Sequence, residues 1–192
     1  MTTESPDFLF FDMGNVLITF DLDVISERMA KVAGVEPRKV LQSFFGETGG
    51  FWDAESGQIT SDELYESFCQ ATDSRPDPYE LNVAACSTFA VNTPILPVLV
   101  ALRRAGNRLG ILSNICEAHW LWCIGHYRFL TDIFDCRLAS YELGYRKPDR
   151  EIFVKAAQIA GATVGKELTA ERIFFTDDVS CNVRGAVAAG WD

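Results

Sequence analysis

Four short apolar runs, each ending at a small polar or acidic residue, constrain the fold of this 192-residue chain most strongly. The runs are 8–11 before Asp12, 109–112 before Ser113 and Asn114, 173–175 before Thr176, Asp177 and Asp178, and the weaker 136–139 before Ser140. Their hydrophobicity is continuous rather than alternating, which is typical of strands buried on both faces of a parallel sheet. We therefore expect one sheet that is covered by helices on both sides.

Helix signals lie between these runs. The stretch "PILPVLVALRRAG" (94–106) has apolar residues at helical spacing, arginines in its last turn and a glycine at its end. The stretches "REIFVKAAQIAG" (150–161) and "NVRGAVAAG" (182–190) follow the same pattern. Strands that alternate with helices predict the α/β class, with a doubly wound, mostly parallel sheet and a Rossmann-like core.

Residues 21–90 interrupt this alternation. Helices are expected near 22–33, 36–45, 60–71 and 79–90, with no convincing strand between them. Thr60 and Glu63 in "TSDEL" have the spacing of a capping box ahead of a helix, and the turn-rich stretches "GETGGF" and "SRPDP" separate the helices. The pattern predicts a helical cap at 21–90, inserted after the first strand of an α/β catalytic core that comprises 1–20 and 91–192.

Composition narrows the classes of partner. A formal net charge of −10 argues against nucleic acid, because phosphate backbones require a basic face. No apolar run approaches the ~18 residues of a membrane span, and the first residues do not resemble a signal peptide. The six cysteines form no C-x-x-C pair and are expected to be reduced thiols. We therefore expect a cytoplasmic protein that binds neither membrane nor nucleic acid.

Polar residues at the strand ends predict a binding site, because ligands of open α/β sheets bind at the carboxyl ends of the strands. The residues at these ends are Asp12, Ser113, Asn114, Asp177 and Asp178. If the strands are neighbours, three carboxylates and a hydroxyl converge. Like charges at such close range are costly unless a cation lies among them, and oxygen ligands favour Mg²⁺.

One lysine completes the predicted chemistry. Lys147 lies in "ELGYRKPD" (142–149), after the fourth apolar run, and Pro148 stiffens the backbone beside it. A lysine at this place can contact both a phosphate and the Asp12 carboxylate. An aspartate nucleophile, Mg²⁺, a lysine and a hydroxyl suit phosphoryl transfer through an aspartyl-phosphate. The catalytic demand of that reaction is mainly electrostatic.

Four motifs now carry a resemblance to a known family. The stretches "FDMGNVL", "ILSN", "YRKPD" and "FFTDDVSCNVRGA" resemble, in order and spacing, the four motifs of the haloacid dehalogenase superfamily. The resemblance covers nearly the whole chain, and the insertion matches the cap of one large branch. "DMGNVL" and "YELGYRKPD" are most similar to its small sugar-phosphate phosphatases. The resemblance implies a Mg²⁺-dependent phosphatase that acts on a small phosphorylated metabolite. It also implies that the cap closes over the site and selects this substrate.

The resemblance also implies a role for each site residue. By that likeness Asp12 is the nucleophile and a metal ligand, and the Gly14 backbone carbonyl is a second metal ligand. Asp178 is the carboxylate that binds the metal, and Asp177 is either a further ligand or a residue that contacts the ligands from behind. Ser113 and Asn114 hold the phosphoryl oxygens, and Lys147 contacts both the phosphate and Asp12.

Two features depart from the family pattern. At the position of Gly14 most of its phosphatases carry a second Asp, which protonates the leaving oxygen and later activates water. Loss of a general acid typically costs ~10²–10⁴-fold, which is less than the ~10⁶-fold or more of a whole enzyme. Activity is therefore expected to survive, best on glycosyl 1-phosphates, whose leaving hydroxyl is more acidic, or with a proton from the cap or from water. Such domains also usually continue with another strand after "GWD", so we expect the natural protein to extend beyond Asp192.

Two other functions stay open from the sequence. A metal-independent haloacid dehalogenase uses the same Asp nucleophile, but it usually has Tyr at the position of Gly14 and no acids in the fourth motif, so Asp177 and Asp178 argue against it. An impaired family member with a binding or regulatory role is favoured by Gly14 alone.

Aromatic and imidazole side chains have two interpretations each. Phe51 and Trp52 belong either to the core of the cap or to its substrate-facing surface, and His119 either packs or lines the mouth of the site. Cys116, His119, Cys123 and His126 recur at helical spacing, but four ligands over about three turns are too far apart to close on one metal.

Overall fold

The computed structural model describes residues 5–46 and 49–192 and is built around a four-stranded parallel sheet. The strands are β1 (Phe8–Phe11), β4 (Leu109–Ser113), β5 (Cys136–Ala139) and β6 (Ile173–Thr176), in the order β5–β4–β1–β6. All three strand pairs are parallel, and Phe11 lies opposite both Ile111 and Thr176. The four apolar runs are these strands, and the predicted α/β class is confirmed.

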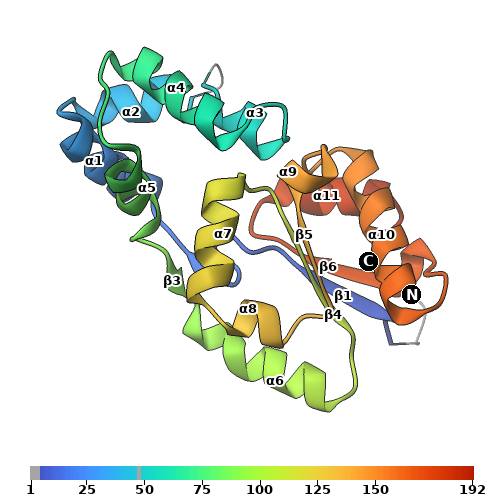
Figure 1. The fold of residues 1–192 in the computed structure, drawn as a ribbon. Coiled ribbons are helices and arrows are strands. Elements are labelled where there is room, and N and C mark those ends of the chain that lie inside the picture. Colours follow the sequence, from blue (N-terminus) through green and yellow to red (C-terminus); the bar gives the residue numbers. More distant parts are fainter. Residues whose placement is uncertain (1–4, 47–48) are drawn as a thin grey trace.

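Helices cover both faces of the sheet (Figure 1). The core helices are α6 (Leu96–Arg104), α7 (Glu117–His126), α8 (Phe129–Asp132), α9 (Ser140–Leu143), α10 (Arg150–Val164) and α11 (Ser180–Ala188), with 3-10 turns at Thr93–Ile95 and Ala170–Arg172. Helices α6, α7 and α8 contribute to one apolar cluster, and α10 and α11 contribute to the other. This arrangement is the expected doubly wound core.

Side-chain alternation along β1 explains why its sequence is apolar at every position. Phe8 and Phe10 belong to the cluster under α10, whereas Leu9 and Phe11 belong to the cluster under α6 and α7. Successive side chains of a strand point to opposite faces, and each face of this sheet is covered. A strand buried on both sides therefore needs apolar residues throughout, and Asp12 is the first residue after its carboxyl end.

The insertion after β1 is helical and has its own core (Figure 1). Its helices are α1 (Leu22–Ala33), α2 (Pro37–Ser43), α3 (Phe51–Glu55), α4 (Ser61–Thr72) and α5 (Pro78–Cys86). The capping box before α4 is confirmed, because the Glu63 N–H donates to the Thr60 hydroxyl and the Thr60 N–H donates to the Glu63 carboxylate at 2.8 Å. The division into 1–20 with 91–192 and 21–90 stays a prediction.

Two expectations for the insertion were wrong. The helix expected at 79–90 ends at Cys86, and β3 (Ala90–Val91) follows it as an antiparallel partner of β2 (Ile18–Thr19). The short helix α3 was not expected at all. The pairing partners of β3 lie about seventy residues earlier in the chain, and no local pattern reveals them. This two-stranded ribbon forms the passage between the core and the insertion.

Candidate active site

A cavity of about 470 Å³ opens at the carboxyl ends of the strands, between the core and the insertion. Six of the seven predicted site residues line it: Asp12, Gly14, Ser113, Asn114, Lys147 and Asp178. They meet because β1 lies between β4 and β6, so that the ends of these strands share one edge of the sheet. Phe51, Trp52 and Glu55 of α3 close the cavity from the side of the insertion.

Lys147 connects two of the carboxylates. Its ammonium group donates to Asp12 Oδ1 at 2.7 Å, to Asp177 Oδ2 at 2.5 Å and to the Leu112 carbonyl at 2.9 Å. The three bonds match the three protons of an ammonium group. Its side chain is 1% exposed, so the cation and the two carboxylates are buried together. Each charge offsets the desolvation of the other, and removal of one would leave the rest uncompensated.

Asp12 is buried and held in position. Its backbone N–H donates to the Thr176 carbonyl at 2.9 Å, and its side chain is held by Lys147. Burial raises the pKa of the Asp12 carboxyl to about 6, the charge of Lys147 opposes that rise, and the charge of Asp177 adds to it. The carboxylate is therefore mostly ionised at pH 7 and becomes protonated as the pH falls below about 6.

The two acids after β6 have different environments. Asp177 Oδ1 accepts hydrogen bonds from the Val179 N–H at 2.8 Å and from Asn182 Nδ2 at 3.1 Å, and its side chain is fully buried. Asp178 is exposed and lines the cavity. One carboxylate oxygen from each of Asp12, Asp177 and Asp178 lies within 4.8 Å of the others, the only such cluster of three metal-ligating residues in the described ranges. Three clustered oxygen donors fit a hard divalent cation such as Mg²⁺.

Asn114 has a role that its motif did not suggest. Its Nδ2 donates to the Lys147 carbonyl at 2.8 Å, and its Oδ1 accepts from the Lys147 N–H at 2.8 Å. Both ends of the amide thus position the lysine backbone, and the backbone N–H of Asn114 and the second Nδ2 proton stay available to a phosphoryl oxygen. The Ser113 side chain is buried and lies at the wall of the same cavity.

Position 14 faces the Asp12 carboxylate. A Cβ placed on Gly14 would lie 3.8 Å from Asp12 Oδ2 and 3.0 Å from Cε1 of the Phe20 ring. A longer side chain at this position would therefore reach the reacting group, as the family pattern implies, and the Phe20 ring occupies the neighbouring space. No described residue donates a hydrogen bond to the Gly14 carbonyl, so this oxygen is available to a cation.

Both interpretations hold for the aromatic residues and for His119. Phe51 lines the cavity and also packs in the core of the insertion, and Trp52 lines the cavity with 40% of its surface exposed. His119 lines the cavity between the rings of Phe51 and Phe89, with ring centres 5.5 and 5.2 Å away. Burial lowers the pKa of His119 to about 4, so this imidazole is neutral at pH 7.

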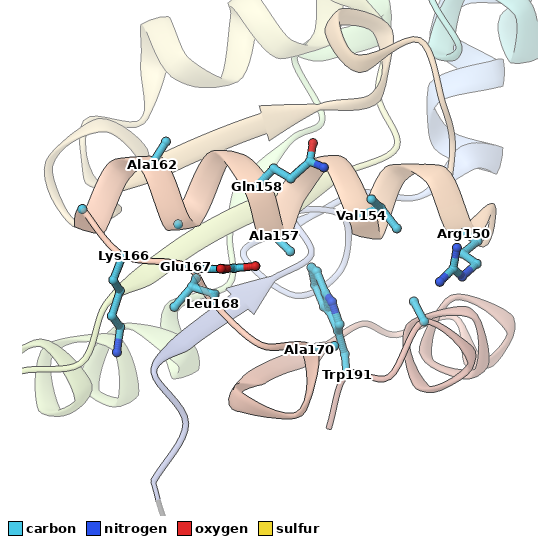
Figure 2. A pocket seen from close by; sticks show the side chains of 13 residues that line it. Arg150, Val154, Ala157, Gln158, Ala162, Lys166, Glu167, Leu168, Ala170 and Trp191 are labelled. Carbon is cyan, nitrogen blue, oxygen red and sulfur yellow. The ribbon is translucent and has the colours of Figure 1, made fainter.

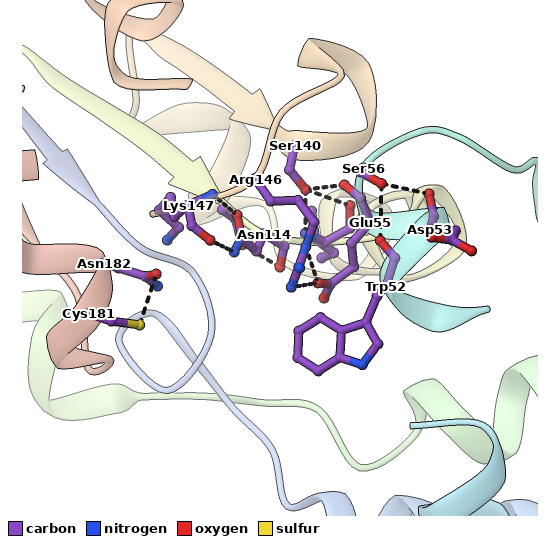
Figure 3. Close-up of polar contacts among 12 residues, drawn as sticks. Trp52, Asp53, Glu55, Ser56, Asn114, Ser140, Arg146, Lys147, Cys181 and Asn182 are labelled. Atoms are coloured by element: carbon purple, nitrogen blue, oxygen red, sulfur yellow. Dashed lines mark hydrogen bonds and ion pairs between the residues drawn. The ribbon is translucent and has the colours of Figure 1, made fainter. Parts of the chain in front are cut away.

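Glu55 and Arg146 belong to the site but were missed. Arg146 Nε and Nη2 donate to Glu55 Oε2 at 3.0 and 2.6 Å, and the guanidinium lies 4.2 Å from the centre of the Trp52 ring (Figure 3). Arg146 directly precedes Lys147 in "YRKPD", and this position is only a weak indication that Arg146 belongs to the site. Glu55 lies 91 residues earlier, in the helix that was not expected, so no spacing in the sequence connects the pair.

A second, larger cavity of about 680 Å³ lies along α10 and Trp191 (Figure 2). None of the predicted site residues is among the residues that line it, and its charged groups, Arg150, Lys166 and Glu167, are not gathered around one point (Figure 2). Size alone does not identify an active site. The smaller cavity is the candidate active site because it combines a buried carboxylate, a buried ammonium group and a cluster of metal-ligating residues.

Two curated proteins resemble the chain over most of its length. No protein-family model matches the chain. The chain is 32% identical over 165 residues to pyrimidine 5'-nucleotidase YjjG of Escherichia coli, covering 81% of this chain and 72% of that protein. It is 27% identical over 191 residues to phosphatase MT3486 of Mycobacterium tuberculosis, covering 94% and 82%.

Solved structures show the same fold. The HAD family enzyme bt-2542 of Bacteroides thetaiotaomicron, in complex with magnesium and inorganic phosphate, superposes with a TM-score of 0.80 at 26% identity, covering 98% of this chain and 92% of that one. The L-2-haloacid dehalogenase of Xanthobacter autotrophicus has a TM-score of 0.68 at 17% identity, over 97% and 75% of the two chains, which shows a shared fold only. Magnesium in the first structure, together with the carboxylate cluster of this chain, confirms the predicted Mg²⁺ cofactor.

Proposed function

Because this chain belongs to the haloacid dehalogenase superfamily and is a phosphatase of that family, we propose that it hydrolyses a small sugar phosphate through an aspartyl-phosphate on Asp12. The observation that carries the proposal is the buried arrangement in which Lys147 binds both Asp12 and Asp177 beside the metal-ligating cluster. This arrangement provides a nucleophile, a fixed cation and a cation site at one point, which phosphoryl transfer requires.

Each residue has a part in this mechanism. Lys147 holds Oδ1 of Asp12, so the carboxylate is oriented for in-line attack on phosphorus by Oδ2. Ser113 and the backbone N–H of Asn114 receive the phosphoryl oxygens. Asp12, Asp178 and the Gly14 carbonyl hold Mg²⁺, and Asp177 orients Lys147 behind them. Bound Mg²⁺ supplies charge stabilisation on the phosphoryl oxygens.

The insertion completes the site. Residues 21–90 form the proposed cap, which excludes water from the reacting groups and selects the substrate through Phe51 and Trp52 of α3. The aromatic side chains Phe51 and Trp52 offer apolar surface on which a sugar ring can stack.

Substrate preference follows from leaving-group acidity. Where no other group replaces the acid that position 14 lacks, a glycosyl 1-phosphate is expected to be hydrolysed more efficiently than the corresponding 6-phosphate, with kcat/KM about tenfold higher or more. Phosphate release from both isomers of one sugar, at saturating Mg²⁺, measures this ratio. Equal kcat/KM values for the two isomers would contradict the leaving-group argument.

A nucleotide is the second candidate substrate, because YjjG is a pyrimidine 5'-nucleotidase and aromatic residues line the cavity of this chain. The leaving hydroxyl of a nucleoside 5'-phosphate is weakly acidic, like that of a sugar 6-phosphate. The lack of a carboxyl side chain at Gly14 therefore favours the glycosyl phosphate over the nucleotide. A panel that includes pyrimidine 5'-monophosphates decides between the two classes.

Metal removal is the second test. Phosphatase activity is expected to disappear in EDTA and to return with added Mg²⁺, because the three clustered carboxylates need a cation between them and the phosphate. The variant Asp178→Asn is expected to need more Mg²⁺ for half-maximal activity. Phosphatase activity that survives in EDTA would contradict the metal requirement, and halide release from a 2-haloacid in EDTA would support metal-independent dehalogenase chemistry instead. Absence of turnover on every phosphate, with Mg²⁺ bound, would support an impaired, regulatory protein.

A cytoplasmic location belongs to the same proposal. All six cysteines are free, and five of them are buried. None of the helices within the described residues is long and apolar enough to cross a bilayer. Unpaired thiols of this kind are typical of a reducing compartment.

A further inference from the structure

Glu55 belongs to the insertion, yet it forms part of the catalytic cavity wall. It is 8% exposed and lines the same cavity as Asp12. Its carbonyl accepts a hydrogen bond from the Ser140 hydroxyl at 2.5 Å (Figure 3). Two residues later, Gly57 has φ +69° and lies so close to the Tyr141 carbonyl that a Cβ would not fit. The end of α3 is thus docked directly on the core, which holds the Glu55 carboxyl at a defined place.

Two consecutive residues of one loop hold the two carboxyl groups. Arg146 binds Glu55 through two hydrogen bonds, and Lys147 binds Asp12 at 2.7 Å. Adjacent Cα atoms lie about 3.8 Å apart, so Glu55 and Asp12 are anchored to the same short stretch of the cavity wall. Both bonds from Arg146 reach Oε2, and no described residue bonds to Oε1. That oxygen is therefore available to a bound molecule.

The surroundings of Glu55 suit a group that carries a proton. Burial raises the pKa of the Glu55 carboxyl above its ordinary value, and the negative charge of Asp12 adds to the rise. The cations Arg146 and Lys147 oppose it, and the thiol of Cys116 at the start of α7 also interacts with Glu55. A dianionic phosphate ester beside Asp12 would favour the protonated form further.

We infer that Glu55 is the proton donor and acceptor that Gly14 does not provide, an inference that rests on the proposed phosphatase function. In the first step Asp12 forms a bond to phosphorus, the bond from phosphorus to the leaving oxygen breaks, and the proton on Glu55 Oε1 moves to that oxygen to give the alcohol. In the second step the Glu55 carboxylate takes a proton from water and the water oxygen bonds to phosphorus. The bond to Asp12 breaks, which releases inorganic phosphate and restores both residues.

The test compares two leaving groups in the variant Glu55→Gln. For a sugar 6-phosphate, whose alkoxide leaving group needs a proton, kcat/KM is expected to fall about 10²–10⁴-fold. The phenolate that leaves p-nitrophenyl phosphate needs no proton, so the attack of Asp12 on phosphorus is expected to be unaffected. The rate constant for nitrophenolate release in a single turnover is therefore expected to equal the wild-type value. The matched control is Asp53→Asn, which removes a carboxylate from the exposed face of the same helix and is expected to change neither rate.

A second variant keeps the inference testable if Glu55→Gln does not fold. Because Arg146 lowers the pKa of Glu55, the variant Arg146→Gln is expected to move the alkaline limb of the pH–kcat/KM profile for the 6-phosphate to higher pH. An unmoved limb would overturn the inference. So would a Glu55→Gln variant that loses equal factors on both substrates, or none on either. Failure of the wild-type protein to release phosphate from any ester would instead refute the proposed function.

Discussion

Replacement of Asp12 by Asn is expected to lower kcat/KM for phosphate release by roughly 10⁴-fold or more, because the reaction loses its nucleophile. An amide cannot form the acyl phosphate. It also lacks the negative charge that attracts the Lys147 ammonium, which lies 2.7 Å from the carboxylate oxygen in the native protein. The measurement is phosphate release from p-nitrophenyl phosphate at saturating Mg²⁺. This substrate has an acidic leaving group, so its hydrolysis depends least on a proton donor.

The same variant is expected to fold. Asn has nearly the shape of Asp, Lys147 keeps its contact with Asp177, and burial already raises the pKa of the Asp12 carboxyl to about 6, so an uncharged side chain is tolerated there. Thermal unfolding without Mg²⁺ checks this point, with the exposed Asp53→Asn as control. Activity of Asp12→Asn within about tenfold of wild type would exclude Asp12 as the nucleophile.

Replacement of Lys147 by Met is expected to abolish activity and to lower the free energy of unfolding by about 3–5 kcal/mol. Asp12 and Asp177 would be left buried with no cation between them. For a chain of this length that loss corresponds to a decrease in Tm of about 10 °C. The control Lys31→Met removes an exposed lysine of α1 and is expected to change the free energy of unfolding by less than about 0.5 kcal/mol.

The loss in Lys147→Met is expected to depend on pH. The pKa of Asp12 is raised in the folded state, so the stability linked to its protonated form is lost as the pH rises through about 6. Lys147 lowers that pKa, and its removal raises the pKa further. The decrease in Tm is therefore expected to be larger at pH 8 than at pH 5 in the absence of Mg²⁺. A decrease that is equal at both pH values would contradict the assignment of Asp12 and Lys147 as a coupled pair.

Much of the core and of its reactive edge could be predicted from local pattern. A strand covered on both faces must be apolar at every position. The apolar runs that precede Asp12, Ser113 and Asp177 therefore predicted both the sheet and the edge at which its polar residues lie. The capping box at Thr60 and Glu63 likewise placed the start of α4. These features depend on neighbours in sequence, which is why a single chain revealed them.

The tertiary structure alone decided which partners these residues meet. It paired β2 with β3, turned the Asn114 amide onto the backbone of Lys147, and placed the Phe20 ring beside Gly14. It also brought Glu55 to Arg146 across 91 residues. Contacts of this kind form when segments that are distant in sequence pack together. Such packing produces no periodic pattern in the sequence from which it could be predicted. The sequence therefore determined the fold class and the predicted nucleophile Asp12, whereas the folded chain determined the surroundings of Asp12 and of Glu55, the proton donor that we propose.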